Sequence, residues 1–312
     1  MTTVLVTGGA GFIGSHVVEK LVDRDYNVIV VDNLRTGNPN NLKGVIDSIE
    51  FERIDITDPI ALSSVMDDVD VVVHLAAQTN VRYSMECPFD DMEANVVGTL
   101  NVAVQAARHD VERVVYSSSG GAVYGEPEYL PVDEDHPTRP ISNYGVSKLT
   151  GEHYLRVQAE EAGFDHVILR YANVYGPRQD PSGEAGVISV FLERALKGEP
   201  LVVFGDGEQT RDFVYVEDVA RVTADCVEKG EGVYNIGTGR ETSVNEIIEM
   251  IRKVVGEDVE VVYDDPRPGE VRRIYLDISK AESELGFSPR VDLEEGISRT
   301  YEWMRERVLG DG

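Results

Sequence analysis

Residues 8–14 read Gly8-Gly9-Ala10-Gly11-Phe12-Ile13-Gly14, and this glycine-rich stretch decides the fold. The apolar run before it, residues 3–7, predicts a buried strand, and residues 12–21 carry apolar side chains at helical spacing. A strand, a glycine turn and a helix in this order are typical of a dinucleotide-binding unit. There the glycines permit a tight turn, close approach to a pyrophosphate and close helix–strand packing. The N–H groups at the helix N-terminus face the phosphates.

A second apolar strand is expected over residues 27–31, and Asp32 follows it, 18 positions after Gly14 (32 − 14). An acid at this place accepts hydrogen bonds from an adenosine ribose, which favours NAD over NADP. Arg35 favours NADP instead, because an arginine can hold the 2′-phosphate of that cofactor. A glycine-rich turn in some other βα unit is the alternative interpretation, and Asp32 favours the dinucleotide site.

The chain has 312 residues, which is enough for a full core and two lobes. Hydrophobic residues make up 42%, and no stretch is long and apolar enough to cross a bilayer. The N-terminus shows no signal-peptide pattern. Cys87 and Cys226 form no disulfide framework. We therefore expect a cytoplasmic protein.

The net charge is extreme, because 57 acidic residues face 29 basic ones and leave −28. Such a surface repels nucleic acids and anionic membranes, so neither is an expected partner. The acids are spread along the whole chain rather than gathered in a tail. This distribution predicts adaptation to high salt, where screening removes most of the self-repulsion.

The first half of the chain alternates predicted strands and helices. Beyond Asp32 the expected strands are residues 48–54, 70–75, 113–118 and 166–171, and the expected helices are residues 59–66, 88–107 and 142–162. This alternation predicts an α/β fold, a Rossmann-type doubly wound parallel sheet with helices on both faces. Ligands bind such sheets at the carboxyl ends of the strands.

From residue 176 the pattern changes, which predicts a smaller mixed α/β lobe over the carboxyl edge of the sheet. Its expected strands are residues 201–204, 212–216 and 233–236, and its expected helices are residues 187–196, 217–228, 244–255, 279–285 and 293–308. We assign residues 1–175 to an NAD-binding Rossmann domain and residues 176–312 mainly to a nucleotide-sugar-binding lobe. Elements near residues 212–236 are expected to return to the main sheet.

Tyr144 and Lys148 lie four residues apart at the start of a predicted helix, and therefore on one face. A cation beside a phenol stabilises the phenolate, so the pair can work as a base. The same spacing also occurs by chance on amphipathic helices. Here it follows a predicted strand that ends in Ser117-Ser118-Ser119, where a serine can share a substrate hydroxyl with the tyrosine. Local bonding of these serines to the backbone is the alternative.

With these motifs the chain resembles the extended short-chain dehydrogenase/reductases, and among them the NAD-dependent nucleotide-sugar epimerases, most closely the UDP-glucose 4-epimerases. The resemblance covers essentially the whole chain. It rests on residues 7–16, 144–148 and 170–177 in the first part, and on residues 204–213 and 266–270 in the second. It implies an isomerase that works with a tightly held NAD that is not consumed.

The resemblance implies that four segments contact NAD. They are the glycine turn, the adenosine loop (residues 32–37), the segment below the nicotinamide ribose (residues 75–78) and the predicted helix that carries Tyr144 and Lys148. The expected cofactor-binding residues are Gly8, Gly11, Phe12, Ile13, Gly14, Asp32, Asn33, Thr36, Gly37, Asp55, Ile56, Leu75, Ala76, Ala77, Gln78, Asn95, Ser117, Tyr144, Lys148 and Tyr171. No metal is expected.

On the substrate side the resemblance implies that Arg211 and Arg267 clamp the diphosphate, since arginine offers bidentate geometry to phosphate. A surface ion pair is the alternative for each arginine on so acidic a chain. The expected substrate-binding residues are Ser119, Asn173, Arg178, Val187, Arg211 and Arg267.

The expected catalytic residues are Tyr144, Lys148, Ser119 and Ser118. The serine has two candidates because the family has one residue fewer between its serines and the following Val-Tyr-Gly. Aligned from the strand, Ser119 is the catalytic serine; aligned from Val123, the position falls on Gly120. We prefer Ser119, with Ser118 as the second choice. Residues 120–122, Gly-Gly-Ala, lack the acidic groups that the family's dehydratases and decarboxylases carry there.

The implied reaction is inversion at C4 of UDP-glucose or UDP-galactose through a transient 4-keto sugar. Tyr144 takes the proton of the C4 hydroxyl, and hydride leaves C4 for NAD and returns to the opposite face. Ile274 stands where the family gates a 2-acetamido group, and its medium size leaves UDP-GlcNAc and UDP-glucuronate open as substrates. A catalytically silent NAD-binding sensor is the alternative from another class. The family also implies a homodimer through a four-helix bundle of residues 88–107 and 142–162.

Overall fold

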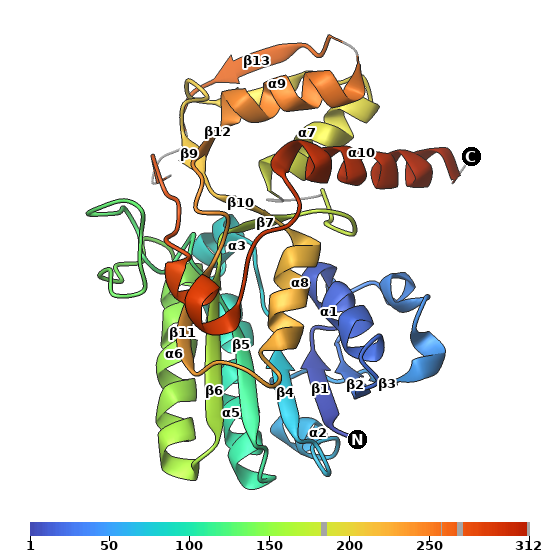
Figure 1. Ribbon diagram of the computed structural model, residues 1–312, viewed down its shortest axis with the longest axis vertical. Coiled ribbons are helices and arrows are strands. Elements are labelled where there is room, and N and C mark those ends of the chain that lie inside the picture. The colour runs from blue at the N-terminus through green and yellow to red at the C-terminus, as the bar shows by residue number, and fades with distance from the viewer. Residues whose placement is uncertain (182–185, 257, 267–270, 311–312) are drawn as a thin grey trace.

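A seven-stranded parallel sheet lies at the centre of the larger lobe, and the computed structural model describes residues 1–181, 186–256, 258–266 and 271–310 (Figure 1). The strand order is β11-β6-β5-β4-β1-β2-β3. The strands are β1 (Thr3–Thr7), β2 (Asn27–Val31), β3 (Ile49–Glu52), β4 (Val71–His74), β5 (Arg113–Ser119), β6 (Asp165–Tyr171) and β11 (Gly232–Ile236). Continuous apolar runs form the central strands because helices cover both faces. The predicted fold class is confirmed, and the order reverses between β1 and β4, where such sheets bind ligands.

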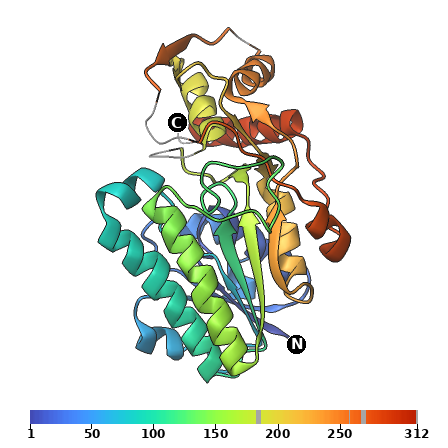
Figure 2. The ribbon, with the colours of Figure 1, turned by 90° about the vertical axis from the view of Figure 1, so that its left-hand side faces the viewer.

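Helices cover the two faces of the sheet in two groups. α1 (Phe12–Val22) and α8 (Val216–Asp225) pack on the face that carries Val4 and Val6, in one apolar cluster. α2 (Pro59–Ser63), α5 (Gly98–Arg108) and α6 (Asn143–Ala162) pack on the face of Leu5, in a second cluster. Strand side chains alternate between faces, which explains how neighbouring residues enter different cores. Figure 2 shows α5 and α6 side by side. Two short helices, η1 (Pro39–Leu42) and η2 (Ile46–Ser48), follow β2.

The second lobe stands over the carboxyl ends of the strands (Figure 1). Its core joins apolar residues of α7 (Val187–Leu196), α9 (Val244–Val255) and α10 (Leu293–Gly310) with those of β8 (Leu201–Phe204) and β10 (Phe213–Tyr215). Its remaining elements are β7 (Asn173–Tyr175), β9 (Thr210–Arg211), β12 (Thr242–Ser243), β13 (Val261–Asp264) and η4 (Ala281–Leu285). β11 lies in the central sheet beside β6. The division at residue 175 stays an interpretation.

The predicted helix over residues 88–107 is divided into three parts. α4 (Pro88–Met92) leads into a π-helical turn, η3 (Glu93–Val97), and α5 follows. Extra residues in a helical turn re-aim the side chains inside it, and such turns occur often at functional sites. Asn95, an expected cofactor residue, lies in η3. The helix α3 (Val81–Glu86) and the strands β7, β9, β12 and β13 have no counterpart in the sequence-based prediction.

Cys226 is a buried free thiol, and Cys87 is a partly buried one. Among the helices in the described part of the chain, none combines the length and the apolar character needed to cross a membrane.

Candidate active site

The glycine turn between β1 and α1 has the shape that its sequence predicts. Gly8 takes a positive φ of 72°, and a Cβ there would lie 2.7 Å from the backbone nitrogen of Ala76. A Cβ on Gly14 would lie 2.1 Å from the carbonyl oxygen of Gly8. Gly11 caps α1 without a side-chain hydrogen bond, and the first turn of α1 contains no acid. The backbone of this turn can therefore approach an anion closely.

Asp32, at the carboxyl end of β2, is buried beside this turn. Its Oδ2 accepts a hydrogen bond from the Ala10 nitrogen at 3.0 Å, and its Oδ1 accepts one from the Leu34 nitrogen at 2.8 Å. A carboxylate retains further lone pairs for a ribose hydroxyl. Gly37 is packed against it, since a Cβ there would lie 2.6 Å from Asp32 Oδ1. Burial raises the pKa of Asp32, against the hydrogen bonds that lower it.

Of the other expected cofactor residues near Asp32, some lie at the surface and one lies in the core. Asn33 donates from Nδ2 to Asp55 Oδ2 at 2.8 Å, so these two expected cofactor residues are brought together. Thr36 is exposed. Ile56 is buried in the core below, where a Cβ on Gly98 would touch it.

The loop after β4 is held by β1 and by the π-helical turn. The nitrogens of Leu75 and Ala76 each lie 3.2 Å from Thr7 Oγ1. Asn95 binds the Gln78 backbone twice, accepting from its nitrogen and donating to its oxygen, both at 2.8 Å. The structure thus positions residues 75–78 beside the glycine turn, at the carboxyl edge of the sheet.

Tyr144 enters the site from the first turn of α6. Ser142 begins this helix, accepting a hydrogen bond from the Gly145 nitrogen at 3.1 Å, and Ser84 of α3 accepts one from the Tyr144 nitrogen at 3.0 Å. The phenol is hydrogen-bonded to the side chain of Ser119, which ends β5. Burial raises the pKa of Tyr144 to about 12, while the Ser119 bond lowers it and the charge of Asp91 raises it.

Lys148 is buried one helical turn after Tyr144. Its Nζ donates to the carbonyl oxygen of Ser117 at 2.9 Å and lies 6.0 Å from the centre of the Tyr144 ring. Burial lowers the pKa of Lys148 to about 8, and the charges of Asp91 and Glu152 oppose this. Of the causes that act on the pKa of Tyr144, only the Ser119 hydrogen bond lowers it, and burial outweighs this bond in the protein alone.

Ser118 points to the other side of β5. Its Oγ donates to Glu152 Oε1 at 2.5 Å, and Arg170 holds the same carboxylate through Nε at 3.0 Å and Nη2 at 2.6 Å. All three side chains are buried. Ser118 is therefore occupied in a buried ion-pair network, whereas Ser119 bonds Tyr144, which favours Ser119 as the serine of the site.

The sequence and structure together now match a known family. The family model described as "NAD dependent epimerase/dehydratase family" matches residues 4–237. The chain belongs to this family. A Methanocaldococcus jannaschii protein, named provisionally as a UDP-glucose 4-epimerase, is 53% identical over 303 residues, with 97% of this chain and 98% of that protein covered.

Two solved structures of epimerases are similar to the whole fold. The Thermotoga maritima UDP-glucose 4-epimerase with UDP-glucose is 45% identical with a TM-score of 0.95, covering 98% of this chain and 100% of that one. The Thermus thermophilus UDP-glucose 4-epimerase in complex with NAD is 43% identical with a TM-score of 0.92, covering 97% and 99%. NAD, the expected cofactor, agrees with the family, and the close glycine cradle and the acceptor Asp32 fit it.

The expected substrate residues of this family member are only partly assembled. Asn173, in β7, lies close to Gly121, since a Cβ on Gly121 would be 3.7 Å from Asn173 Oδ1. Val187 begins α7, and Arg211 in β9 donates to the carbonyl oxygen of Thr210 at 2.7 Å. Arg267 lies outside the described residues.

Two expected residues point elsewhere. Arg178, an expected substrate residue, donates to Glu19 of α1 at 2.5 Å and forms an ion pair with it. The Tyr171 hydroxyl lies 2.7 Å from Thr223 Oγ1 of α8, which turns this side chain into the core and leaves its backbone near the site. The sequence indicated neither partner, because both belong to distant helices.

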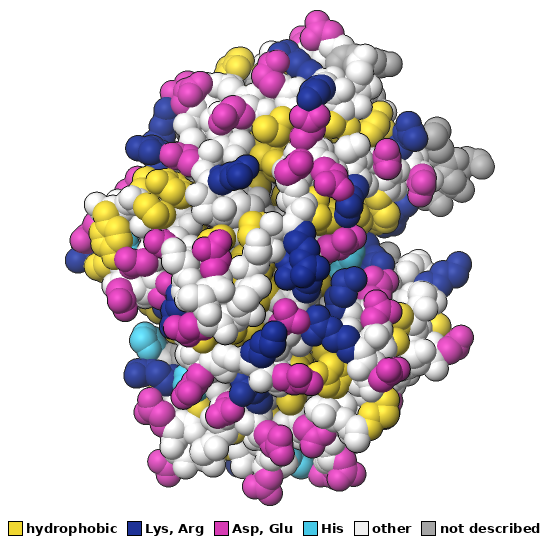
Figure 3. All heavy atoms as spheres, in the orientation of Figure 1, with side chains coloured by type: hydrophobic (Ala, Val, Ile, Leu, Met, Phe, Trp, Pro, Cys, Tyr) yellow, Lys and Arg dark blue, Asp and Glu magenta, His cyan; other side chains and the backbone are white. Residues whose placement is uncertain are grey.

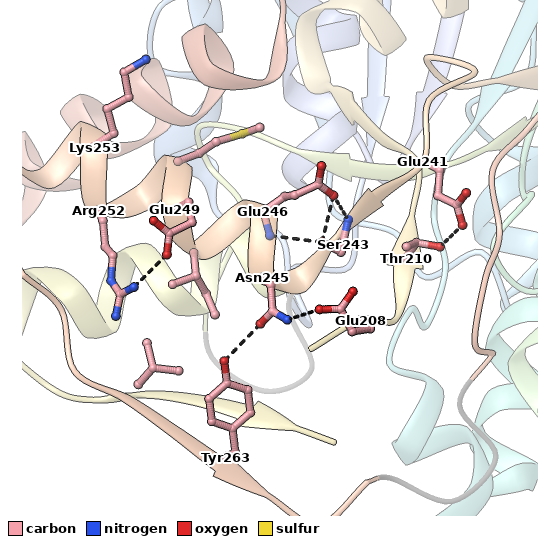
Figure 4. A pocket seen from close by; sticks show the side chains of 13 residues that line it. Glu208, Thr210, Glu241, Ser243, Asn245, Glu246, Glu249, Arg252, Lys253 and Tyr263 are labelled. Carbon is pink, nitrogen blue, oxygen red and sulfur yellow. Dashed lines mark hydrogen bonds and ion pairs between the residues drawn. The ribbon is translucent and has the colours of Figure 1, made fainter. Parts of the chain in front are cut away.

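A hollow of about 1010 Å³ opens beside α9 (Figure 4), and Thr210, the neighbour of Arg211, is among its lining residues. Its lining includes the carboxylates of Glu208, Glu241, Glu246 and Glu249. Two of these carboxylates are held in ion pairs, Glu249 with Arg252 at 2.8 Å and Glu241 with Arg273 at 2.6 Å, and Lys253 adds a further basic side chain to the lining. Within the described ranges, no group of three or more His, Cys, Asp or Glu residues is placed to hold a metal ion.

Proposed function

We propose that this protein interconverts UDP-glucose and UDP-galactose by inverting C4 of the sugar, with NAD as a resident cofactor. The observation that carries the proposal is the hydrogen bond between Tyr144 and Ser119 at the carboxyl end of β5, above buried Lys148. The family and the similar structures support the same chemistry. The residues proposed to hold NAD are those of the glycine turn, Asp32 with its loop, and residues 75–78.

The proposed acid–base step belongs to Tyr144. In its ionised form, the phenolate of Tyr144 accepts the proton of the C4 hydroxyl and becomes a phenol, while Ser119 holds that hydroxyl at the same point. Lys148 contributes a positive charge one turn away. When bound, oxidised NAD would supply the hydride acceptor and a second positive charge in the site. General-base chemistry needs proximity first and a tuned pKa second, and in the protein alone burial raises the pKa of Tyr144.

The loop after β5 favours epimerisation over the elimination and decarboxylation chemistry of other family branches. Residues 120–122 provide no carboxyl group. A Cβ on Gly120 would lie 2.7 Å from Leu276 Cδ1 and 3.2 Å from the carbonyl oxygen of Arg170, so a larger side chain there would require Leu276 to move. An intermediate 4-keto sugar therefore meets no second acid–base group in this loop.

The substrate lobe is proposed to hold the nucleotide through Asn173, Val187, Arg211 and Arg267. Affinity then comes from the part of the substrate that does not react, which leaves the sugar free to turn over between the two hydride transfers. Ile274 is buried among apolar residues of the larger core. Because Ile274 is of medium size, UDP-GlcNAc and UDP-glucuronate remain alternatives to UDP-galactose as the substrate.

A panel of UDP-sugars tests the proposal. The purified protein is incubated in high KCl with UDP-galactose, UDP-GlcNAc or UDP-glucuronate, without added NAD, and products are separated by chromatography while absorbance reports NADH. We expect UDP-galactose to approach equilibrium with UDP-glucose fastest, with no net NADH. If only UDP-GlcNAc or only UDP-glucuronate were converted, that sugar would take the place of UDP-galactose as the proposed substrate. If no sugar were converted, even with added NAD, the result would favour the catalytically silent NAD-binding sensor.

A homodimer is proposed through the helices α4–α5 and α6, which lie side by side (Figure 2). A contiguous patch of exposed apolar side chains is typical of an interaction surface. In this protein, many of the exposed apolar side chains belong to these helices and to α3. They are Met85, Phe89, Met92, Val97, Val146, Tyr154 and Val157.

Replacing Phe89, whose side chain is 78% exposed, by Asp is expected to convert the dimer into a monomer in sedimentation equilibrium. A charge buried in an apolar interface carries a large desolvation cost. Ile60→Asp is the matched control, because Ile60 is 82% exposed on α2 and should leave the mass unchanged. A wild-type protein that sediments as a monomer in high KCl would refute the dimer.

Adaptation to high salt is proposed from the charge of −28. Acidic side chains are scattered over the visible face of both lobes, whereas several basic side chains gather between the lobes (Figure 3). Salt shortens the screening length from about 10 Å at 0.1 M to about 3 Å at 1 M, which weakens the repulsion between these charges.

The melting temperature is therefore expected to rise as KCl increases into the molar range, and calorimetry or circular dichroism measures it. A parallel series in sucrose separates screening of charge from general exclusion of a solute. A melting temperature that does not respond to KCl would contradict the proposal. The expected cytoplasmic location stays a prediction of the sequence.

A further inference from the structure

Asp91 of α4 is a fully buried carboxylate that no catalytic role above uses. Its Oδ1 accepts hydrogen bonds from Gln78 Nε2 at 2.9 Å and from Asn95 Nδ2 at 3.0 Å. Its Oδ2 accepts one from Ser147 Oγ at 2.5 Å. The three donors are neutral, and no Lys, Arg or His in the described part of the chain forms an ion pair with Asp91. A buried negative charge thus lies among residues that border the site.

Backbone contacts fix both amides so that their nitrogens face Asp91. The Gln78 Oε1 accepts from the Asn80 nitrogen at 2.5 Å, and the Asn95 Oδ1 accepts from the Gln78 nitrogen at 2.8 Å. Each amide oxygen is therefore engaged, and each amide nitrogen donates one hydrogen to a backbone oxygen and the other to the carboxylate. A group that meets only donors is suited to the ionised form.

The partners of Asp91 connect three segments of the site. Gln78 belongs to the loop after β4, Asn95 to the π-helical turn, and Ser147 is the neighbour of Lys148 on α6. The charge of Asp91 opposes the fall that burial causes in the pKa of Lys148. The same charge raises the pKa of Tyr144. Its influence therefore reaches both reacting side chains.

Other ionisable groups near Lys148 and Tyr144 contribute less net charge. Burial lowers the pKa of His74 to about 3 and raises the pKa of Tyr116, so both are neutral near pH 7. Glu152 faces Lys148 too, but its carboxylate is paired with Arg170 at 2.6 Å. Asp91 is the carboxylate in the described surroundings whose charge is not balanced by an ion pair.

We propose that Asp91 is a positioning residue of the reaction: it ties the loop of Gln78 to α6 and supplies the negative charge that keeps Lys148 in its ammonium form. The part of this inference that concerns catalysis rests on the proposed function. Its electrostatic part concerns the protein alone and can be measured without substrate or cofactor.

The test compares Asp91→Asn with the wild-type protein. The substitution removes the charge and keeps the shape, and Ser147 can accept a hydrogen bond instead of donating one. Lys148 is titrated by NMR of ¹³C-lysine-labelled, NAD-free protein, with its signal assigned through Lys148→Met. We expect Lys148 to titrate at a lower pH in Asp91→Asn, by roughly half a unit or more. In the active enzyme both limbs of the pH profile of kcat should move to lower pH, since Tyr144 and Lys148 each lose a nearby negative charge.

Ser147→Ala is the matched control, because it removes one hydrogen bond and leaves the charge. Lys148 should then titrate as in the wild type. An unmoved Lys148 titration in folded Asp91→Asn, or an equal shift in Ser147→Ala, would overturn the inference. If the Lys148 signal shifts as expected but every UDP-sugar is inert, the electrostatic role stands and the proposed function fails.

Discussion

Tyr144→Phe is expected to lower kcat for UDP-galactose by about two to four orders of magnitude, the range that general acid–base groups contribute. The ring remains and fills the same space, so only the hydroxyl that bonds Ser119 is lost. Without it, the group that is proposed to accept the C4 proton is missing. The fold and the affinity for NAD should stay close to those of the wild type.

Initial rates by chromatography, circular dichroism and NAD binding by equilibrium dialysis measure these effects. Tyr154→Phe is the control on the same helix, because Tyr154 is 40% exposed and lies outside the site. It should keep wild-type turnover. If Tyr144→Phe retained a rate within tenfold of the wild type while Tyr154→Phe behaved alike, Tyr144 would not be the base.

Gly14→Ala is expected to weaken NAD binding by about a hundredfold, which corresponds to about 2.7 kcal/mol. The added Cβ would lie 2.1 Å from the carbonyl oxygen of Gly8 and 2.9 Å from the Cα of Gly9. Both neighbours are backbone atoms of the cradle, so the helix and the turn must separate. The separation moves the N–H groups at the start of α1 away from the pyrophosphate.

Binding of NAD to cofactor-free protein, by calorimetry or dialysis, measures this loss. Gly44→Ala is the matched control, because a Cβ there meets nothing within 4 Å. The control should bind NAD as the wild type does. Wild-type affinity in folded Gly14→Ala would show that the dinucleotide does not sit on this turn.

The sequence predicted the first βαβ unit closely, because its signals are local. The predicted strands over residues 3–7 and 27–31 have the bounds of β1 and β2, and α1 begins at Phe12 as expected. Apolar runs and glycines at a turn act within a few residues, and no distant contact is needed to read them. The helix over residues 244–255 was predictable for the same reason, with Ser243 and Glu246 forming a capping box.

The rest depends on tertiary contacts that sequence spacing does not contain. Asn95 bonds the backbone of Gln78 from inside a π-helical turn, and the helical pattern gave no sign of that turn. The choice between Ser118 and Ser119 needed the folded positions of Glu152 and Tyr144, two residues of α6 that bond Ser118 and Ser119 respectively. The strands β9 and β12 have two residues each, too few for any period to show.

The contacts of Asp91 could be predicted in part from the sequence. Its spacing of four residues from Asn95 was a usable signal, because such a pair shares one helix face. The raised pKa of Tyr144 could not be predicted, since burial is a property of the folded chain.

The central claim is that the hydrogen taken from C4 is returned to the same carbon. The most direct measurement uses UDP-galactose with deuterium at C4, in ordinary water, and determines the label in the UDP-glucose formed by mass spectrometry and NMR. The account predicts that deuterium is retained at C4 with the configuration inverted. Replacement of deuterium by solvent hydrogen would contradict it, because C4 would then have been inverted by proton exchange rather than by hydride transfer.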